Sequence, residues 1–202
     1  MIDSGIKAIN IVTNGGLKEG SLIEIFGDEQ SGKTGSLLTV SKKFESVIYF
    51  DMDNTFPHSI IPIIMKDSSH ITKISLTSDR QWVDCLDDSI NFPPKTLLVF
   101  DPISVINPYL VSAYIGKIMQ LTSSGKTVIL VSHSNSLNRS PIHSTAAMFC
   151  SQRLEYRYID KILRHEEKQP IGFRTKIRAI KNASSSAMKT AIMEVYFDTG
   201  IK

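Results

Sequence analysis

The sequence predicts an α/β fold in which helices flank both faces of a central, mainly parallel sheet, with an antiparallel extension at the C-terminal end. Three observations predict it. Apolar runs alternate with helix-like segments along the first 150 residues, as in sheets buried between two helical layers. A glycine-rich loop joins one apolar run to a helix at residues 27–34. After about residue 150, strand-like segments follow one another with only turns between them.

Strands of the parallel part are predicted by short apolar runs, each bounded by turn residues or acids. They are residues 21–26, 47–50, 71–76, 96–100 and 127–131. The run at 71–76 alternates apolar and polar residues, whereas the others are apolar almost throughout.

Helices are predicted between these strands by the spacing of apolar residues. The expected segments are residues 33–44, 79–90 and 109–121. Ser78 is a suitable N-cap for the second helix. Residues 93–94 are both proline and interrupt the chain before the next strand, and a Ser-Ser-Gly turn ends the third helix.

The C-terminal extension consists of residues 158–164, 173–181 and 189–197, separated by turns at 166–172 and 182–186. No helix of useful length fits between these segments, so they predict an antiparallel meander that extends the parallel sheet. A chain of 202 residues is the size of one domain. We therefore expect a single domain over 1–202, with a parallel core at about 20–150 and an antiparallel basic extension at about 151–202.

Charge is unevenly distributed along the chain. Residues 1–150 hold 12 Lys and Arg against 14 Asp and Glu, whereas residues 151–202 hold 11 against 6. Within the extension, alternation places Arg174, Lys176 and Arg178 on one face of a strand. This pattern indicates either an anionic partner or a solvated basic face.

Composition and patterning exclude several classes of protein. The apolar runs, such as residues 59–65, are far shorter than the roughly 20 residues that a membrane span requires. The first 20 residues lack the basic and apolar regions of a secretory signal. Cys85 and Cys150 are isolated, without a CxxC pair or a histidine at metal-binding spacing. We therefore expect a cytoplasmic protein with no membrane segment and with both cysteines buried as small hydrophobic side chains.

The strongest motif is a phosphate-binding loop of the form GxxxxGK[ST] between the first strand and the first helix. Glycines let the backbone N–H groups turn toward phosphate oxygens, and the helix N-terminus adds positive potential. Lys33 is expected to reach the β- and γ-phosphates, and the Thr34 hydroxyl to ligate Mg²⁺. The predicted binding residues are Gly27, Asp28, Glu29, Gln30, Ser31, Gly32, Lys33, Thr34 and Gly35.

Polar residues at the ends of other strands complete the predicted site. Asp101 ends a buried strand, where a carboxylate faces the ligand crevice and can hold Mg²⁺. Asp51 and Asp53 follow the second strand and are candidates for the group that orients or deprotonates an attacking water. His133 ends a further strand and is placed to sense the γ-phosphate.

With these residues in view, the chain resembles the ATPase core of the RecA/RadA recombinase superfamily, and among its members the short archaeal RadB paralogues. The resemblance begins in residues 4–9 and 15–21 and ends in residues 197–201. It includes the acidic pair after the second strand, the Asp101-Pro102-Ile103 segment, and paired basic residues similar to Lys176 and Arg178. It implies a P-loop NTPase with a RecA-like core.

Two departures from the family pattern concern the reaction. Asp51-Met52-Asp53 stands where the family usually has Asp-x-Glu, so the carboxylate that resembles the catalytic one is a methylene shorter. A base displaced by about 1 Å can lose on the order of a hundredfold in rate, which predicts slow hydrolysis. Ser132-His133 stands where the family usually has Asn-Gln, which implies a different coupling between γ-phosphate and DNA.

The resemblance implies ATP and Mg²⁺ as ligands, with Asp53 as the base for in-line attack of water. It implies an accessory or regulator of DNA recombination and repair that works beside a main recombinase or other repair proteins. Because the ATPase core begins almost at the first residue, we expect a monomer or small oligomer that forms no independent filament.

Modest binding of single-stranded DNA is also implied. The contacts expected in the loop after His133 are Asn135, Asn138, Arg139 and His143. Arg174, Lys176 and Arg178 are expected to reach either DNA or an ATP bound in a neighbouring subunit.

Other functions share these features. A non-catalytic module that uses ATP only to gate its assembly is favoured by Asp53 and His133. A KaiC-like signalling ATPase has the same fold. A small-molecule P-loop kinase is disfavoured, because it needs an Arg-rich lid.

Overall fold

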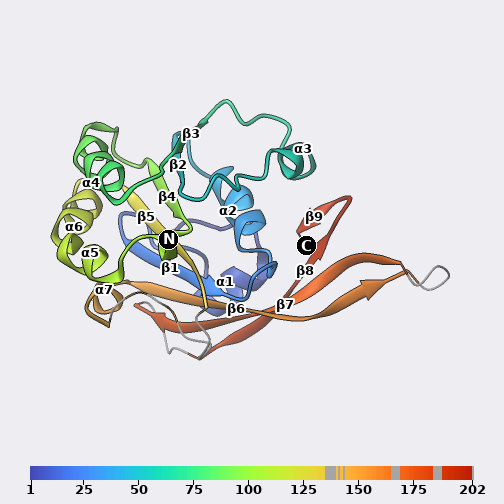
Figure 1. The fold of residues 1–202 in the computed structure, drawn as a ribbon. Helices are drawn as coiled ribbons and strands as arrows, with labels where there is room; N and C mark the ends of the chain where they lie inside the picture. Colours follow the sequence, from blue (N-terminus) through green and yellow to red (C-terminus); the bar gives the residue numbers. More distant parts are fainter. Residues whose placement is uncertain (135–139, 141, 143, 165–168, 184–187, 202) are drawn as a thin grey trace.

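The computed structural model describes residues 1–134, 140, 142, 144–164, 169–183 and 188–201. Within these ranges, a single sheet of nine strands runs through the molecule in the order β3-β2-β4-β5-β1-β6-β7-β8-β9 (Figure 1). The strands are β1 (Leu22–Gly27), β2 (Val47–Asp51), β3 (Ile71–Ser75), β4 (Leu97–Asp101), β5 (Thr127–His133), β6 (Gln152–Leu163), β7 (Pro170–Asn182), β8 (Thr190–Tyr196) and β9 (Gly200–Ile201).

Helices precede and connect the parallel strands. They are α1 (Lys7–Thr13), α2 (Lys33–Ser41), α3 (Ile61–Ile64), α4 (Asp79–Asp88), α5 (Pro108–Ala113), α6 (Ile115–Ser123) and α7 (Ser144–Phe149), with short 3₁₀ turns at His58–Ile60, Ser89–Asn91 and Ile103–Val105. The hydroxyl of Ser78 accepts a hydrogen bond from the N–H of Gln81 (3.3 Å) and caps α4, as the sequence predicts.

The parallel part runs from β3 to β6, with β1 between β5 and β6. β2 and β4 are buried along their whole length, because helices cover both faces of the sheet. One apolar layer includes side chains of α1, α2 and α3, and the other includes side chains of α4, α5, α6 and α7. The predicted α/β architecture with a mainly parallel sheet is therefore confirmed.

The C-terminal strands β6, β7, β8 and β9 pair antiparallel in sequence order, which confirms the predicted meander. β6 begins six residues before the predicted start at 158. Its first residues, Gln152–Tyr156, pair parallel with Ile23–Gly27 of β1, and this long-range pairing extends the strand. β6 and β7 form a long hairpin that extends past the helical layers (Figure 1).

Some predicted elements differ from the structure. The helix expected at 109–121 is divided at Tyr114 into α5 and α6, and the helix expected to reach residue 44 ends at Ser41. α1 was not anticipated, because its seven residues are too few to reveal a helical period. Cys150 is buried as expected, whereas Cys85 is only half-buried. No helix in the described part of the chain is long and apolar enough to cross a membrane.

Candidate nucleotide-binding site

The phosphate-binding loop lies between β1 and α2, where the motif predicts it. Gly27 has φ 147°, and a Cβ there would lie 1.9 Å from the carbonyl oxygen of Tyr156 in β6. Gly32 has φ 84°, and its Cβ would lie 3.2 Å from side-chain atoms of Met193 and Val195 in β8. Both glycines are required because neighbouring strands approach the loop closely. Glu29 and Gln30 are exposed at its tip, and Gly35 lies in the first turn of α2.

Lys33 is buried and its ammonium group lies within the loop. Nζ donates hydrogen bonds to the carbonyl oxygens of Gly27 (3.1 Å) and Asp28 (2.5 Å). Burial lowers the pKa of Lys33 to about 8, against the opposing attraction of Asp101 and Asp28. A bound phosphate would therefore replace two carbonyl partners and favour the charged form of the ammonium.

Asp101 and Thr34 form the candidate metal site. The carboxylate of Asp101, at the end of β4, accepts hydrogen bonds at Oδ2 from the Thr34 hydroxyl (3.0 Å) and from the hydroxyl of Tyr49. Burial raises the pKa of Asp101, while these two hydrogen bonds and Lys33 oppose the shift.

The donor chemistry at Asp101 and Thr34 fits Mg²⁺. A carboxylate and a hydroxyl at hydrogen-bond distance supply oxygen ligands, and Mg²⁺ commonly takes few protein ligands, with water and phosphate oxygens as the others. In keeping with this, the described ranges hold no cluster of three or more His, Cys, Asp or Glu side chains that could hold a metal ion.

The two acids at the end of β2, Asp51 as its last residue and Asp53 just after it, have different surroundings. Asp51 is buried and accepts hydrogen bonds from the N–H groups of Thr55 (3.0 Å) and Phe56 (3.3 Å), and it pairs with Lys73 (3.0 Å). Its carboxylate is thus used to hold the turn after β2. Asp53 is exposed and accepts from the N–H (3.1 Å) and hydroxyl (2.5 Å) of Thr55. Burial is the main cause of the raised pKa of Asp101, and the charge of Asp53 adds to it.

His133 ends β5 and lines the same cavity as Lys33 and Thr34. Its Nδ1 atom is buried and has no hydrogen-bond partner within the part of the chain that the structure describes. Buried polar atoms are nearly always paired, so this nitrogen is available to a ligand or a water.

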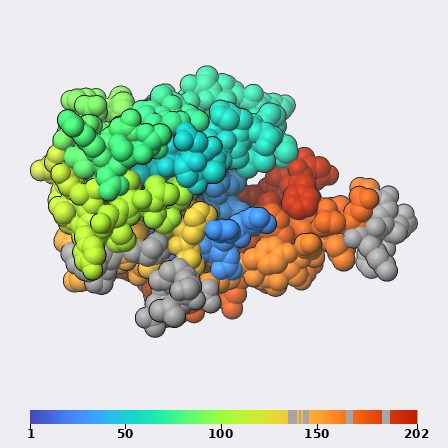
Figure 2. Space-filling model, in the orientation of Figure 1, coloured from blue at the N-terminus to red at the C-terminus, as the bar shows by residue number. Residues whose placement is uncertain are grey.

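The cavity above the loop has a volume of about 610 Å³. Three residues form an aromatic wall of this cavity, namely Tyr158 of β6, Phe173 of β7 and Phe197, which follows β8. Ile60, Lys161, Pro170 and Gly172 also line it. The ring centroids of Tyr158 and Phe173 are 6.0 Å apart, and those of Phe173 and Phe197 are 6.2 Å apart. Figure 2 shows a hollow on this face, between the teal segment after β2 and the orange and red C-terminal strands.

Sequence reasoning missed this aromatic wall. The three residues are up to 39 positions apart and belong to no motif. Antiparallel pairing of the second and third predicted C-terminal strands was the available signal for two of them, because it brings Phe173 and Phe197 to the same end of the meander. Tyr158 begins the first predicted strand, and its position beside Thr175 depends on the start of β6 at Gln152.

Comparison with known proteins agrees with this geometry. No protein-family model matches the chain. The chain is 24% identical to RecA of Phytoplasma mali over 231 residues, which cover 99% of the chain and 68% of that protein. It is also 26% identical to RecA of Mesomycoplasma hyopneumoniae, and this alignment covers 100% of the chain and 68% of that protein. The crystal structure of the RadB recombinase superposes with a TM-score of 0.79 and 15% identity, covering 100% and 98% of the two chains.

The resemblance to the RecA/RadA superfamily is confirmed. The fold is a RecA-like P-loop core, and the solved RadB structure shares it over the full chain.

In this RecA-like core, the predicted basic residues of β7 share one face, opposite the buried Thr175 and Ile177. Arg174 pairs with Asp160 (3.3 Å) and Glu194 (3.1 Å). Lys176 is exposed, and within the described ranges it makes no ion pair.

The third basic residue of this face, Arg178, pairs with the buried Glu155 of β6 (2.7 Å). Glu155, Arg157, Lys176 and Arg178 together line a cavity of about 300 Å³. The face is therefore basic but partly neutralised by acids of the neighbouring strands. The remaining predicted DNA contacts, which are Asn135, Asn138, Arg139 and His143, lie outside the described residues.

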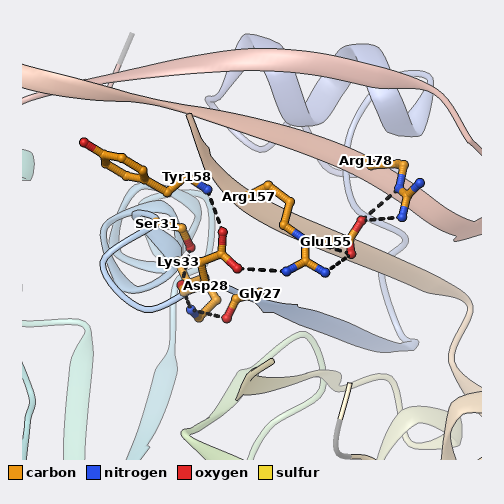
Figure 3. A network of polar contacts seen from close by, with 8 residues as sticks. All are labelled: Gly27, Asp28, Ser31, Lys33, Glu155, Arg157, Tyr158 and Arg178. Carbon is orange, nitrogen blue, oxygen red and sulfur yellow. Dashed lines mark hydrogen bonds and ion pairs between the residues drawn. The ribbon is translucent and has the colours of Figure 1, made fainter. Parts of the chain in front are cut away.

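Asp28 links the phosphate-binding loop to β6. Its carboxylate accepts hydrogen bonds from Arg157 Nη1 (2.8 Å) and from the N–H of Tyr158 (3.0 Å) (Figure 3). Its own N–H donates to the carbonyl oxygen of Tyr156 (3.0 Å). The side chain of Asp28 is therefore a structural contact of the loop, whereas its expected role was to bind phosphate through the backbone.

Proposed function

We propose that the chain binds ATP with Mg²⁺ in the cavity above the loop and hydrolyses it slowly, as an accessory or regulator of DNA recombination and repair. The observation that carries this proposal is that Lys33 and Thr34 line that cavity while Asp101 accepts a hydrogen bond from the Thr34 hydroxyl. Proteins similar in sequence are named RecA, and a similar solved structure is that of a recombinase.

For hydrolysis, Lys33 exchanges its two carbonyl partners for oxygens of the β- and γ-phosphates. Thr34 and Asp101 hold Mg²⁺, which when bound offsets the negative charge on the phosphates. Asp53 accepts a proton from water in line with the γ-phosphate. His133 lines the same cavity, and its Nδ1, which has no partner among the described residues, is the second polar group proposed to sense the γ-phosphate.

Slow turnover is expected because Asp53 has a short side chain held by two hydrogen bonds to Thr55. To act as a base, the Asp53 carboxylate must either break these hydrogen bonds or take the proton from a water that lies farther away. Both of these lower the rate of hydrolysis.

The nucleoside is placed against the aromatic wall. Stacking of a base on an aromatic side chain contributes about 1–3 kcal/mol and tolerates any base. Tyr158, Phe173 and Phe197 all line the cavity and are the candidates for this role.

Nucleic acid is assigned to the basic face of β7, where Lys176 is available to a phosphate. We expect Arg174, Arg178 and Arg139 to contribute, with modest affinity for single-stranded DNA because acids of neighbouring strands pair with two of these four. The whole chain acts as one domain, as a monomer or small oligomer beside a main recombinase.

A second function is favoured by the surroundings of Asp53 and His133: a module that binds ATP to fix its assembly state without hydrolysing it. Steady-state ATP hydrolysis with and without single-stranded DNA separates the two. Lys33→Ala removes the phosphate contact, and Lys42→Ala is the matched control, because Lys42 is exposed at the end of α2.

Turnover that DNA stimulates, and that only Lys33→Ala abolishes, supports the DNA-dependent ATPase. ATP binding with no turnover above the Lys33→Ala background supports the assembly module. Absence of ATP binding overturns both.

A further inference from the structure

A chain of ion pairs connects the basic face of β7 with the phosphate-binding loop (Figure 3). Arg178 donates a hydrogen bond from Nε to Oε2 of Glu155 (2.8 Å), and its Nη2 forms an ion pair with the same oxygen (2.7 Å). Arg157 donates from Nη2 (2.6 Å) and Nε (3.1 Å) to Oε1 of the same carboxylate. The Nη1 group of Arg157 donates to Asp28 in the loop (2.8 Å). Each charge therefore contacts the next from the strand face to the loop.

Glu155 makes the two arginines dependent on each other. Its side chain is only 5% exposed, and a carboxylate so buried requires charged partners. One oxygen is bound by Arg157 and the other by Arg178. When Arg178 is withdrawn, Arg157 is the remaining charged partner of Glu155 within the described residues. The guanidinium of Arg157 is then drawn toward Glu155 and held less firmly at Asp28.

Asp28 is the point at which this chain meets the nucleotide site. Its carbonyl oxygen accepts hydrogen bonds from Lys33 Nζ (2.5 Å) and from the Ser31 hydroxyl (2.7 Å). Its carboxylate adds a negative charge to a loop that binds an anion, and Arg157 neutralises that charge. The position and charge of the loop therefore both depend on Arg157.

We propose that Arg157 is a positioning residue for the phosphate-binding loop and that Arg178, through Glu155, determines how firmly Arg157 holds it. The inference rests on the proposed binding of nucleotide at this loop. A phosphate group that takes Arg178 away from Glu155 would weaken nucleotide binding, and bound nucleotide would weaken that phosphate contact by the same factor.

The test compares Arg178→Gln with Lys181→Gln by the affinity for a fluorescent ADP analogue. Both variants remove one positive charge from β7, but of the two residues Arg178 pairs with Glu155, whereas Lys181 donates to the carbonyl oxygen of Met148. We expect Arg178→Gln to weaken affinity about fivefold, the lower end of typical coupling between sites, and Lys181→Gln to change it less than twofold. Arg178→Lys, which keeps the charge, should restore part of the affinity.

A second comparison uses the Glu155→Gln background, in which no charge links the two arginines. There Arg178→Gln should leave ADP affinity unchanged, because the connection is already broken. This double variant also leaves no unpaired buried carboxylate, so it serves if Arg178→Gln alone does not fold. All measurements are made well below the unfolding temperature of each variant.

Equal effects of Arg178→Gln and Lys181→Gln overturn the inference, as does an effect of Arg178→Gln that persists at full size in the Glu155→Gln background. In both cases wild-type binding still supports the proposed function. Failure of the wild-type chain to bind ADP overturns the proposed function itself, and with it the inference.

Discussion

Lys33 connects the geometry of the loop directly with nucleotide binding. Its ammonium is buried against two carbonyl groups of its own loop rather than held by a nearby carboxylate. Such neutral partners compensate little of the lost hydration, so burial lowers the pKa of Lys33 to about 8. A phosphate ligand would raise the pKa of Lys33 again, because its negative charge stabilises the charged ammonium.

Nucleotide affinity should therefore depend on pH above about 8. Below that value Lys33 is already protonated, and above it binding must include uptake of a proton. The dissociation constant for ADP, measured in EDTA, should be level from pH 7 to 7.5 and should rise by up to about tenfold per pH unit beyond 8. The Lys42→Ala variant should show the same profile, and a level profile to pH 9.5 would contradict the assignment.

The same shift affects stability in a defined direction. The pKa of Lys33 is lower in the folded chain, at about 8, than the ordinary value of 10.5. The unfolded chain therefore binds more protons between these values. The contribution of Lys33 to the free energy of unfolding should rise with pH across that window.

Tyr49 supplies a second prediction at the level of one hydroxyl group. Its buried hydroxyl and that of Thr34 donate to the same oxygen of Asp101. Tyr49→Phe should raise the Mg²⁺ concentration for half-maximal ATP binding several-fold. It should also lower the free energy of unfolding by about 1.5–3 kcal/mol, the typical value of a hydrogen bond to a charged group.

Tyr114→Phe is the matched control for Tyr49→Phe. The ring of Tyr114 packs against Trp82 in the opposite apolar layer. The Tyr114→Phe variant should leave the Mg²⁺ dependence of ATP binding unchanged. A Tyr49→Phe variant that loses stability but keeps the wild-type Mg²⁺ dependence would limit Tyr49 to a structural role.

Among the elements, the C-terminal strands support the phosphate-binding loop from outside. The hydroxyl of Thr175 in β7 donates to the carbonyl oxygen of Ser31 (2.9 Å). Side chains of β8 lie against Gly32, and the backbone of β6 lies against Gly27. The antiparallel extension is thus part of the nucleotide site as well as the carrier of the basic face.

Gly32→Ala tests this support. The new methyl group would occupy a left-handed backbone position and lie 3.2 Å from Met193 and Val195, so the free energy of unfolding should fall by about 1–3 kcal/mol. Gly35→Ala is the control in the next helix, where the methyl group makes ordinary contacts at 3.7 Å, and it should be neutral or stabilising. Urea unfolding measures both, and equal effects would contradict the packing argument.

At the scale of the whole molecule, the C-terminal strands have one packed face and one basic face. One face packs on α1 and the loop, and the other presents Arg174, Lys176 and Arg178. Charge is also divided along the chain, with the excess of basic residues after residue 150. A phosphate backbone is therefore expected to approach from the face of β7 that carries these three residues.

Binding of single-stranded DNA should show this in its salt dependence. Lys176→Gln should reduce the slope of log affinity against log salt concentration by about 0.7, the value for loss of one contact with a single strand. Lys7→Gln removes an equivalent charge from α1, whose layer covers the opposite face, and should leave the slope unchanged. Equal changes in both variants would indicate a general charge effect rather than a site on β7.

Features that depend on neighbouring residues were predictable from the sequence. The loop at residues 27–34 was found because all of its groups lie within eight consecutive positions. Asp101 was found because an apolar run marks the strand that it ends. The direction of the acids after β2 was not predictable, since the turn that binds Asp51 and leaves Asp53 exposed is formed by backbone groups of later residues.

The sequence by itself determined the parallel core, the antiparallel meander and the phosphate-binding loop, because periodicity and local motifs are properties of adjacent residues. Only the tertiary structure decided what surrounds that loop. Parallel pairing of β6 with β1 brings Arg157 to Asp28 across 129 positions, and the meander brings three aromatic rings to one wall. Such contacts depend on strand order and register, which are set by the packing of the whole sheet.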